Sequence, residues 1–138
     1  MSCHGNLFYQ YNLDSQLIRL LYKSKDYVTL IKVLSNLAIF CAIYNEETKF
    51  EIMKYWKDSM RGTGRGETFY HMIDCYKESI RIYELSHPTA DKLARRLYLV
   101  AELCREFAQY NEAEDLYRRA INTQETLFEL KYQVIHFF

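Results

Sequence analysis

Two short helical phrases of the chain match each other at a separation of 41 residues (117 − 76 = 41). Each phrase places an isoleucine four positions after a tyrosine and a glutamate eight positions after it: Tyr76, Ile80 and Glu84, then Tyr117, Ile121 and Glu125. A fixed period in this range is typical of stacked helical hairpins, in which each unit buries its apolar face against the next. The repeat predicts an all-α protein of antiparallel helical hairpins, stacked as a short α-solenoid.

Residues 1–60 are also expected to be a helical region, because apolar residues recur there at helical spacing. Two such series flank the polar break at Ser24–Asp26 and predict a helical hairpin. The residues expected on its inner face are Leu13, Leu17, Leu20 and Leu21, then Val28, Leu30, Ile31 and Leu34. The apolar run Leu37–Tyr44 fits a strand by pattern alone, but its helical neighbours and a cap at Asn36 favour a helix. A further helix is expected to start at Asn45–Thr48 and to end near Met60.

Glycine separates this region from the repeats. Residues 61–66 hold three of the four glycines in the chain and predict a loop. Residues 67–127 then carry the helical repeats, with a stop at Ser86–Pro88, a cap at Thr89 and a turn at Ala108–Gln109. The last repeat helix is expected to bury Ala113, Leu116, Tyr117, Ala120 and Ile121.

The carboxyl-terminal segment breaks the period. Another His-Pro step is due 41 residues after His87 and Pro88, where the chain has Phe128 and Glu129 instead. Residues 128–138 are therefore expected to form an irregular or truncated end, or else a capping helix with an aromatic face. Because an uncapped end of a repeat array exposes apolar surface, this end could support self-association.

Charge and apolar runs restrict the partners. Lys plus Arg and Asp plus Glu both total 18, and neither half of the chain is basic, which argues against a nucleic-acid surface. The longest apolar run, eight residues at Leu37–Tyr44, is far shorter than the roughly 20 that span a membrane. No secretory signal is evident at the amino terminus, so an intracellular, cytoplasmic protein with reduced cysteines is expected.

No residue pattern points to catalysis, a metal or a cofactor. Gly62–Gly66 superficially resembles a phosphate-binding loop, but it lacks the Gly-Lys-Ser/Thr ending and follows a helix, so a plain loop is favoured. His71 and Cys75 lie four residues apart and could share a helix face, yet a zinc site needs three or four ligands. Trp56 is read as core, with a role as a partner-binding anchor left open.

The stretch from Ala94 to Glu125 resembles a tetratricopeptide repeat, a helical hairpin of about 34 residues. The matching positions are Ala101, Tyr110, Ala113, Tyr117 and Ala120, and the departures are Leu97, Cys104, Ala108 and Glu125. The His87-Pro88 step and the phrase from Tyr110 to Ala120 are similar to the kinesin-light-chain type of repeat. The resemblance implies a right-handed α-solenoid that acts as a protein-interaction scaffold, is not an enzyme and binds a peptide or helix in a groove. On this chain the groove positions fall on Arg95, Tyr98, Glu102, Arg105 and Glu106.

The upstream region is similar to the linker between the NACHT domain and the repeat array of nephrocystin-three-like proteins. The similarity rests on Leu20–Tyr27, Leu37–Tyr44, Thr48–Phe50 and Tyr55-Trp56. It implies a fragment of a larger signalling scaffold, ciliary or centrosomal in location. The alternative reading is a regulatory fragment of a NACHT-type nucleotide hydrolase that lacks the nucleotide-binding domain.

Overall fold

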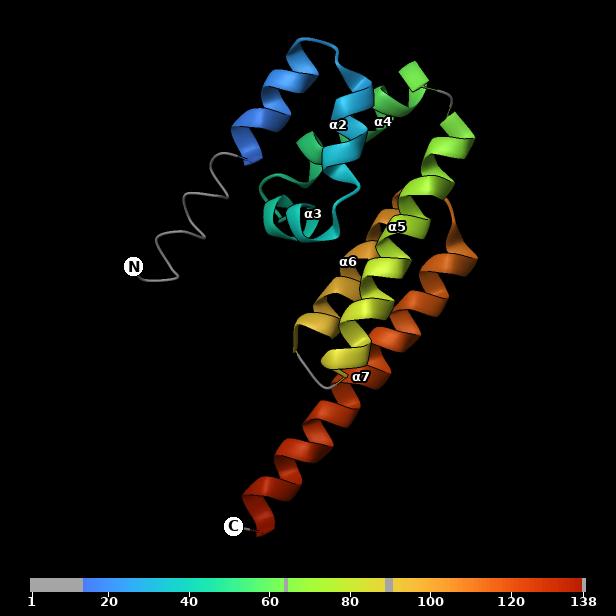
Figure 1. Cartoon of the computed structure of the whole chain (residues 1–138). Helices are drawn as coiled ribbons and strands as arrows, with labels where there is room; N and C mark the ends of the chain where they lie inside the picture. The colour runs from blue at the N-terminus through green and yellow to red at the C-terminus, as the bar shows by residue number, and fades with distance from the viewer. Residues whose placement is uncertain (1–13, 64, 89–90, 138) are drawn as a thin grey trace, which may run out of the picture. The chain divides into compact units, whose positions relative to one another are not determined.

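The computed structural model describes residues 14–63, 65–88 and 91–137 (Figure 1). Within these ranges the chain forms helices joined by short turns and contains no strand, which confirms the all-α prediction. The chain divides into two compact units, Met1–Tyr76 and Lys77–Phe138. The long helix α5 (Arg65–Ser86) contributes its first half to one unit and its second half to the other. The stacking of hairpins into a solenoid stays a prediction.

Local hydrogen bonds explain the short helices of the first unit. A helix over residues 14–23 is followed by α2 (Tyr27–Leu34) and α3 (Leu37–Ile43). The Asp26 side chain accepts from the Thr29 N–H at 3.3 Å and caps α2, and the Asn36 side chain accepts from the Ile39 N–H at 3.2 Å and caps α3. Such caps satisfy backbone donors that have no partner inside the helix. The apolar run after Asn36 is therefore a helix, as predicted.

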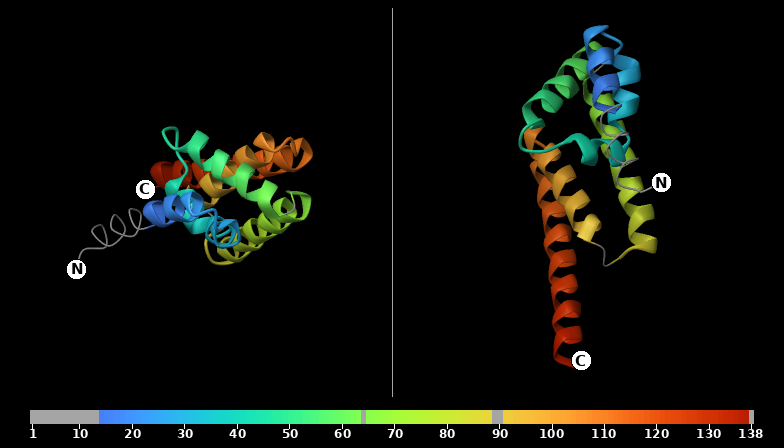
Figure 2. Two further views of the ribbon diagram at one scale, coloured as in Figure 1. Left: turned by 90° about the horizontal axis from the view of Figure 1, so that it is seen from above. Right: turned by 90° about the vertical axis from the view of Figure 1, so that its left-hand side faces the viewer.

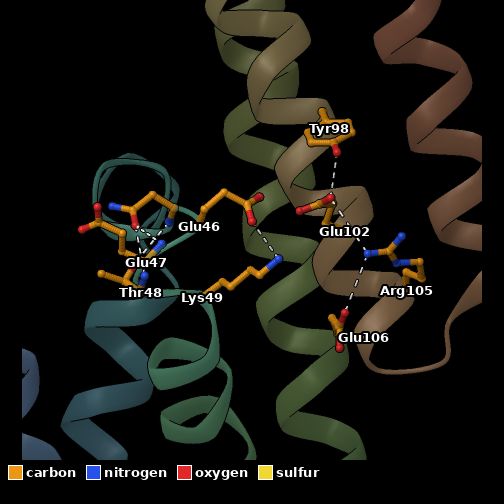
Figure 3. Close-up of polar contacts among 9 residues, drawn as sticks. Glu46, Glu47, Thr48, Lys49, Tyr98, Glu102, Arg105 and Glu106 are labelled. Carbon is orange, nitrogen blue, oxygen red and sulfur yellow. Dashed lines mark hydrogen bonds and ion pairs between the residues drawn. The ribbon is translucent and has the colours of Figure 1, made fainter.

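A compact turn leads into α4 (Lys49–Thr63). The Asn45 side-chain oxygen accepts from the N–H groups of Glu47 at 2.8 Å and Thr48 at 3.0 Å, and the Thr48 hydroxyl accepts from the Asn45 N–H at 3.1 Å (Figure 3). Lys49 adds an ion pair with Glu46 at 2.9 Å. This exchange of side-chain and backbone bonds is the form of a capping box, and it confirms the expected helix start.

The core of the first unit is aromatic. Phe40, Trp56 and Tyr76 are fully buried. The rings of Phe40 and Tyr76 stack with centroids 5.3 Å apart, and the Tyr76 hydroxyl donates to the carbonyl of Leu34 at the end of α2. The burial of Trp56 rules out its alternative role as an exposed anchor.

The predicted Gly-rich loop at residues 61–66 is wrong for its described residues. Helix α4 continues through Thr63 and α5 begins at Arg65, so only residue 64 lies between them, outside the described part. Gly62 is instead a helical residue that the Tyr27 ring approaches closely, because a Cβ placed on it would lie 2.7 Å from that ring. The glycine therefore makes room for an aromatic side chain, and the expected end of the helix near Met60 is three residues early.

The expected inner face of the first hairpin is partly wrong. Leu17, Leu20 and Val28 are 44%, 66% and 60% exposed, whereas Ile18 is buried. The helix over residues 14–23 is oriented by other contacts: the Tyr22 hydroxyl donates to Asp58 at 2.5 Å, and its ring lies 4.3 Å from the Tyr55 ring. The spacing of the leucines alone did not predict that this helix is rotated so that Ile18 is buried and Leu17 and Leu20 are exposed.

The second unit contains residues 77–86 of α5, together with α6 (Asp91–Glu106) and α7 (Tyr110–Phe137). The expected turn at Ala108–Gln109 is confirmed. Ala108 has a φ of 60°, its N–H donates to the Arg105 carbonyl at 3.0 Å, and the Gln109 N–H donates to the Cys104 carbonyl at 2.8 Å. This is the Schellman pattern that ends a helix and reverses the chain, usually with glycine at the left-handed position. The Thr89 cap lies outside the described residues.

Of the two alternatives for residues 128–138, the irregular end is wrong for the described residues up to Phe137, and the helix is confirmed there. Helix α7 runs without a break for 28 residues. Figure 2 shows its last turns extending well beyond the start of α6. The segment after Glu125 contains no proline or glycine, so helical hydrogen bonding continues although the repeat period ends.

Candidate interaction surface

Helices α6 and α7 form a closely packed antiparallel hairpin. The buried stripe of α6 contains Leu93, Leu97, Val100, Ala101 and Cys104, and α7 contributes Ala113, Leu116 and Ala120. Small residues at such a contact let two helix backbones approach closely. Burial raises the pKa of the Cys104 thiol to about 12, so this cysteine behaves as a small apolar core residue.

The groove residues predicted from the resemblance lie on the outer side of α6. Arg95, Arg105 and Glu106 are exposed, Tyr98 is 48% exposed and Glu102 is half-buried. This surface carries both charge signs and one large aromatic side chain.

A polar network connects four of these five residues (Figure 3). The Tyr98 hydroxyl donates to Glu102 at 2.8 Å, and the Arg105 guanidinium lies 3.9 Å from Glu102 and 3.8 Å from Glu106. The hydrogen bond to Glu102 raises the pKa of Tyr98 above its ordinary value. Because the network orients the Tyr98 side chain, the ring is presented to a partner with little further loss of conformational entropy.

A cavity of about 510 Å³ lies between α6 and α7. Its floor contains the small residues Ala94 and Ala120, and Tyr98 and Tyr117 line it with ring centroids 5.7 Å apart. The remaining lining residues are Asp91, Arg95, Ile121 and Gln124. Of the predicted groove residues, the structure places Arg95 and Tyr98 at the cavity, while Glu102, Arg105 and Glu106 do not line it.

Sequence reasoning missed the α7 side of this surface. Tyr117 and Ile121 were expected to face inward, but Tyr117 is half-buried at the cavity and Ile121 is 53% exposed. Their repeat counterparts Tyr76 and Ile80 are buried. The one signal available in the sequence was Gln124, a polar residue three positions after Ile121 on the same helix face.

The second half of α5 runs parallel to α7. Lys77 pairs with Glu112 at 2.6 Å and Glu84 with Arg119 at 3.1 Å, and both pairs are separated by 35 positions (112 − 77 and 119 − 84). A constant positive separation shows that the two segments point the same way, while α6 runs antiparallel to α7. The unit is thus an alternating helix triplet.

The first unit holds a second cavity, of about 550 Å³, between α2 and the first half of α5. His71 and Cys75 line it, with the Cys75 sulfur 3.7 Å from His71 Nε2, so the predicted sharing of a helix face is confirmed. Among the residues described, no group of three or more potential ligands could hold a metal ion. This pair therefore supplies no complete metal site by itself.

The described helices also fall short of a membrane span, because none of them combines sufficient length with sufficient apolar character. No protein-family model matches the chain, and neither the curated proteins nor the solved structures that were searched contain a match. The function is therefore inferred from the geometry of the α6–α7 surface.

Proposed function

We propose that this chain is a helical interaction scaffold that binds a helical or extended segment of a partner protein at the α6–α7 cavity. The observation that carries the proposal is the half-exposed aromatic pair Tyr98 and Tyr117 above a floor of alanines. Aromatic side chains dominate interface energies, and a floor of small residues lets a partner backbone approach. Asp91 and Arg95 beside the cavity supply charges that fix the orientation of the bound segment.

The alternating helix triplet supports the tetratricopeptide-like part of the proposal. In a hairpin array, alternate helices run parallel and neighbours run antiparallel, which is the arrangement of residues 77–86, α6 and α7. The proposal assigns the chain no catalytic step. The cilium or centrosome, which the nephrocystin resemblance implies as the location, is tested by imaging the tagged chain in ciliated cells.

The test begins with partner peptides selected from a displayed helical library against the wild-type chain. Their affinities are then measured by fluorescence polarisation for Tyr98→Ala and for a charge-reversal variant at Arg95. Tyr98→Ala is expected to weaken binding about tenfold or more, because a buried aromatic anchor contributes roughly 2 kcal/mol. The reversal at Arg95 should weaken binding by a smaller factor that decreases with added salt.

The matched control is Tyr70→Ala, which removes a tyrosine of comparable exposure (59%, against 48% for Tyr98) from α5 in the other unit. Its affinity should equal that of the wild type. Circular dichroism must show that each variant keeps its helix content. If folded Tyr98→Ala binds every selected peptide as tightly as the wild type, the cavity is not the binding surface.

A further inference from the structure

Helix α7 carries a stripe of large side chains along the face beside the cavity. Ile121, Phe128 and Tyr132 are 53%, 70% and 55% exposed, and Tyr117 is half-buried. With 3.6 residues per turn, these four residues lie within about 60° of one another around the helix axis. The stripe therefore continues the apolar lining of the cavity toward the end of α7, where no part of α6 runs alongside (Figure 2).

The spacing of the stripe is symmetric. Tyr117 and Tyr132 lie at equal distances from the midpoint between residues 124 and 125, and so do Ile121 and Phe128 (117 + 132 = 121 + 128). If two copies of α7 pack antiparallel about a two-fold axis at this midpoint, each tyrosine meets a tyrosine and each Ile121 meets a Phe128. An interface between identical copies needs this self-complementarity.

Two opposite charges beside the stripe come close to the same symmetry, since 118 + 129 = 247 is two less than the 249 of the stripe. Arg118 and Glu129 lie on one flank of α7, at nearly mirrored positions. In the antiparallel pair, Arg118 of each copy therefore lies near Glu129 of the other, and two equivalent ion pairs can form. Arg118 is exposed on the surface, where it pairs with Glu114 at 2.6 Å. Glu129 is exposed, as are its neighbours Phe128 and Tyr132, so an incoming side chain can reach its carboxylate. Oppositely charged flanks set register and orientation in helix pairs.

We propose that the chain forms a symmetric homodimer in which α7 packs antiparallel against α7 of a second copy. The inference deepens the proposed function, because it names a second copy as the partner of the surface that continues the α6–α7 cavity. The contact from Tyr117 to Tyr132 spans about 24 Å of helix. An interface of this length is small, so the dimer forms in the micromolar range and exchanges.

The first test measures the mass of the full chain in solution by light scattering and sedimentation, at concentrations up to about 0.5 mM. The wild type is expected to pass from monomer to dimer as concentration rises. Phe128→Glu should raise the dissociation constant about tenfold or more, because it places two charges inside the apolar contact. Phe50→Glu is the matched control, since Phe50 is 78% exposed on α4 and lies off the stripe; it should dimerise like the wild type.

The second test locates the axis. Residue 124 lies beside the midpoint, so the two cysteines of a Gln124→Cys dimer should come within disulfide range. Mild oxidation should therefore cross-link the two chains. Asn122→Cys lies on another face of α7 and should cross-link no more than the wild type. Glu125 meets Glu125 of the copy near the axis, and Glu125→Gln should therefore tighten the dimer by about twofold.

The outcomes separate the two proposals. A chain that stays monomeric throughout the concentration range overturns the dimer, and so does a dimer that Phe128→Glu leaves intact. If such a chain still binds selected peptides through Tyr98, the proposed function stands and only the choice of partner fails. Loss of both dimerisation and peptide binding in folded protein would reject both.

Discussion

Replacing Tyr76 by Phe removes one buried hydroxyl and leaves the packing of the first unit almost unchanged. Tyr76 is fully buried, its ring stacks on Phe40, and its hydroxyl donates to the carbonyl of Leu34. That carbonyl belongs to the last residue of α2, where a helix cannot satisfy it internally. Leaving such an acceptor buried without its donor costs about 1–2 kcal/mol of unfolding free energy. The midpoint of thermal unfolding should fall by about 3–6 °C.

Urea unfolding followed by Trp56 fluorescence measures this effect, because Trp56 is the single tryptophan and lies buried in the same unit. The slope of free energy against urea should stay constant while the midpoint falls. Tyr70→Phe, at an exposed position of the same helix, is the control and should change stability by less than about 0.5 kcal/mol. Equal stability of the Tyr76→Phe variant and the wild type would refute the role assigned to this hydrogen bond.

The difference in stability between the wild type and Tyr76→Phe should also depend on pH in the alkaline range. Burial raises the pKa of Tyr76 well above 10. Above pH 10 the unfolded chain loses this proton while the folded chain keeps it, so the wild type loses stability as pH rises. The Tyr76→Phe variant has no hydroxyl at this position and therefore does not lose this stability. The stability gap between wild type and variant should therefore narrow between pH 10 and pH 11, and a constant gap would contradict the burial effect.

Three further predictions concern local structure. Ala108→Gly should stabilise the chain by about 0.5–1 kcal/mol, because it relieves the left-handed conformation at the α6–α7 turn; a lower thermal midpoint would contradict this. At pH 8 the Cys104 thiol, whose pKa is about 12, should react with an alkylating reagent at least about 100-fold more slowly than half-buried Cys75 in the folded chain, and mass spectrometry of peptides would show the order. Asn36→Ala should cost about 1 kcal/mol in urea unfolding through the lost cap of α3, and an unchanged midpoint would mean that the cap contributes nothing.

Helix type and most helix boundaries followed from local physics, and the sequence alone therefore predicted them. The caps at Asn36 and Asn45 and the turn at Ala108 involve side chains and backbone groups within a few residues. Such short-range hydrogen bonds depend on the identity of residues that are close in sequence, so a sequence pattern can predict them. The failure at Gly62 has the opposite cause, because the glycine is required by the Tyr27 ring, 35 residues away in sequence (62 − 27 = 35).

The candidate site was predicted only on α6. Arg95 and Tyr98 stand out there as polar and aromatic residues on the side away from the buried stripe, and the structure places both at the cavity. The α7 side was missed because the repeat match equates Ile121 with Ile80, and equivalent sequence positions need not be equally buried. Ile80 is 1% exposed and Ile121 is 53% exposed. Exposure depends on which elements pack nearby, and a repeat pattern does not contain that information.

By itself, the sequence determined that this chain is helical and where most helices turn, because propensity, capping and periodicity act over one or two helical turns. Only the tertiary structure decided that α4 continues through its glycine, that Ile121 and Phe128 of α7 are exposed, and that Tyr98 and Tyr117 meet at one cavity. These features depend on contacts between residues far apart in the chain, and such contacts exist only once the helices have packed.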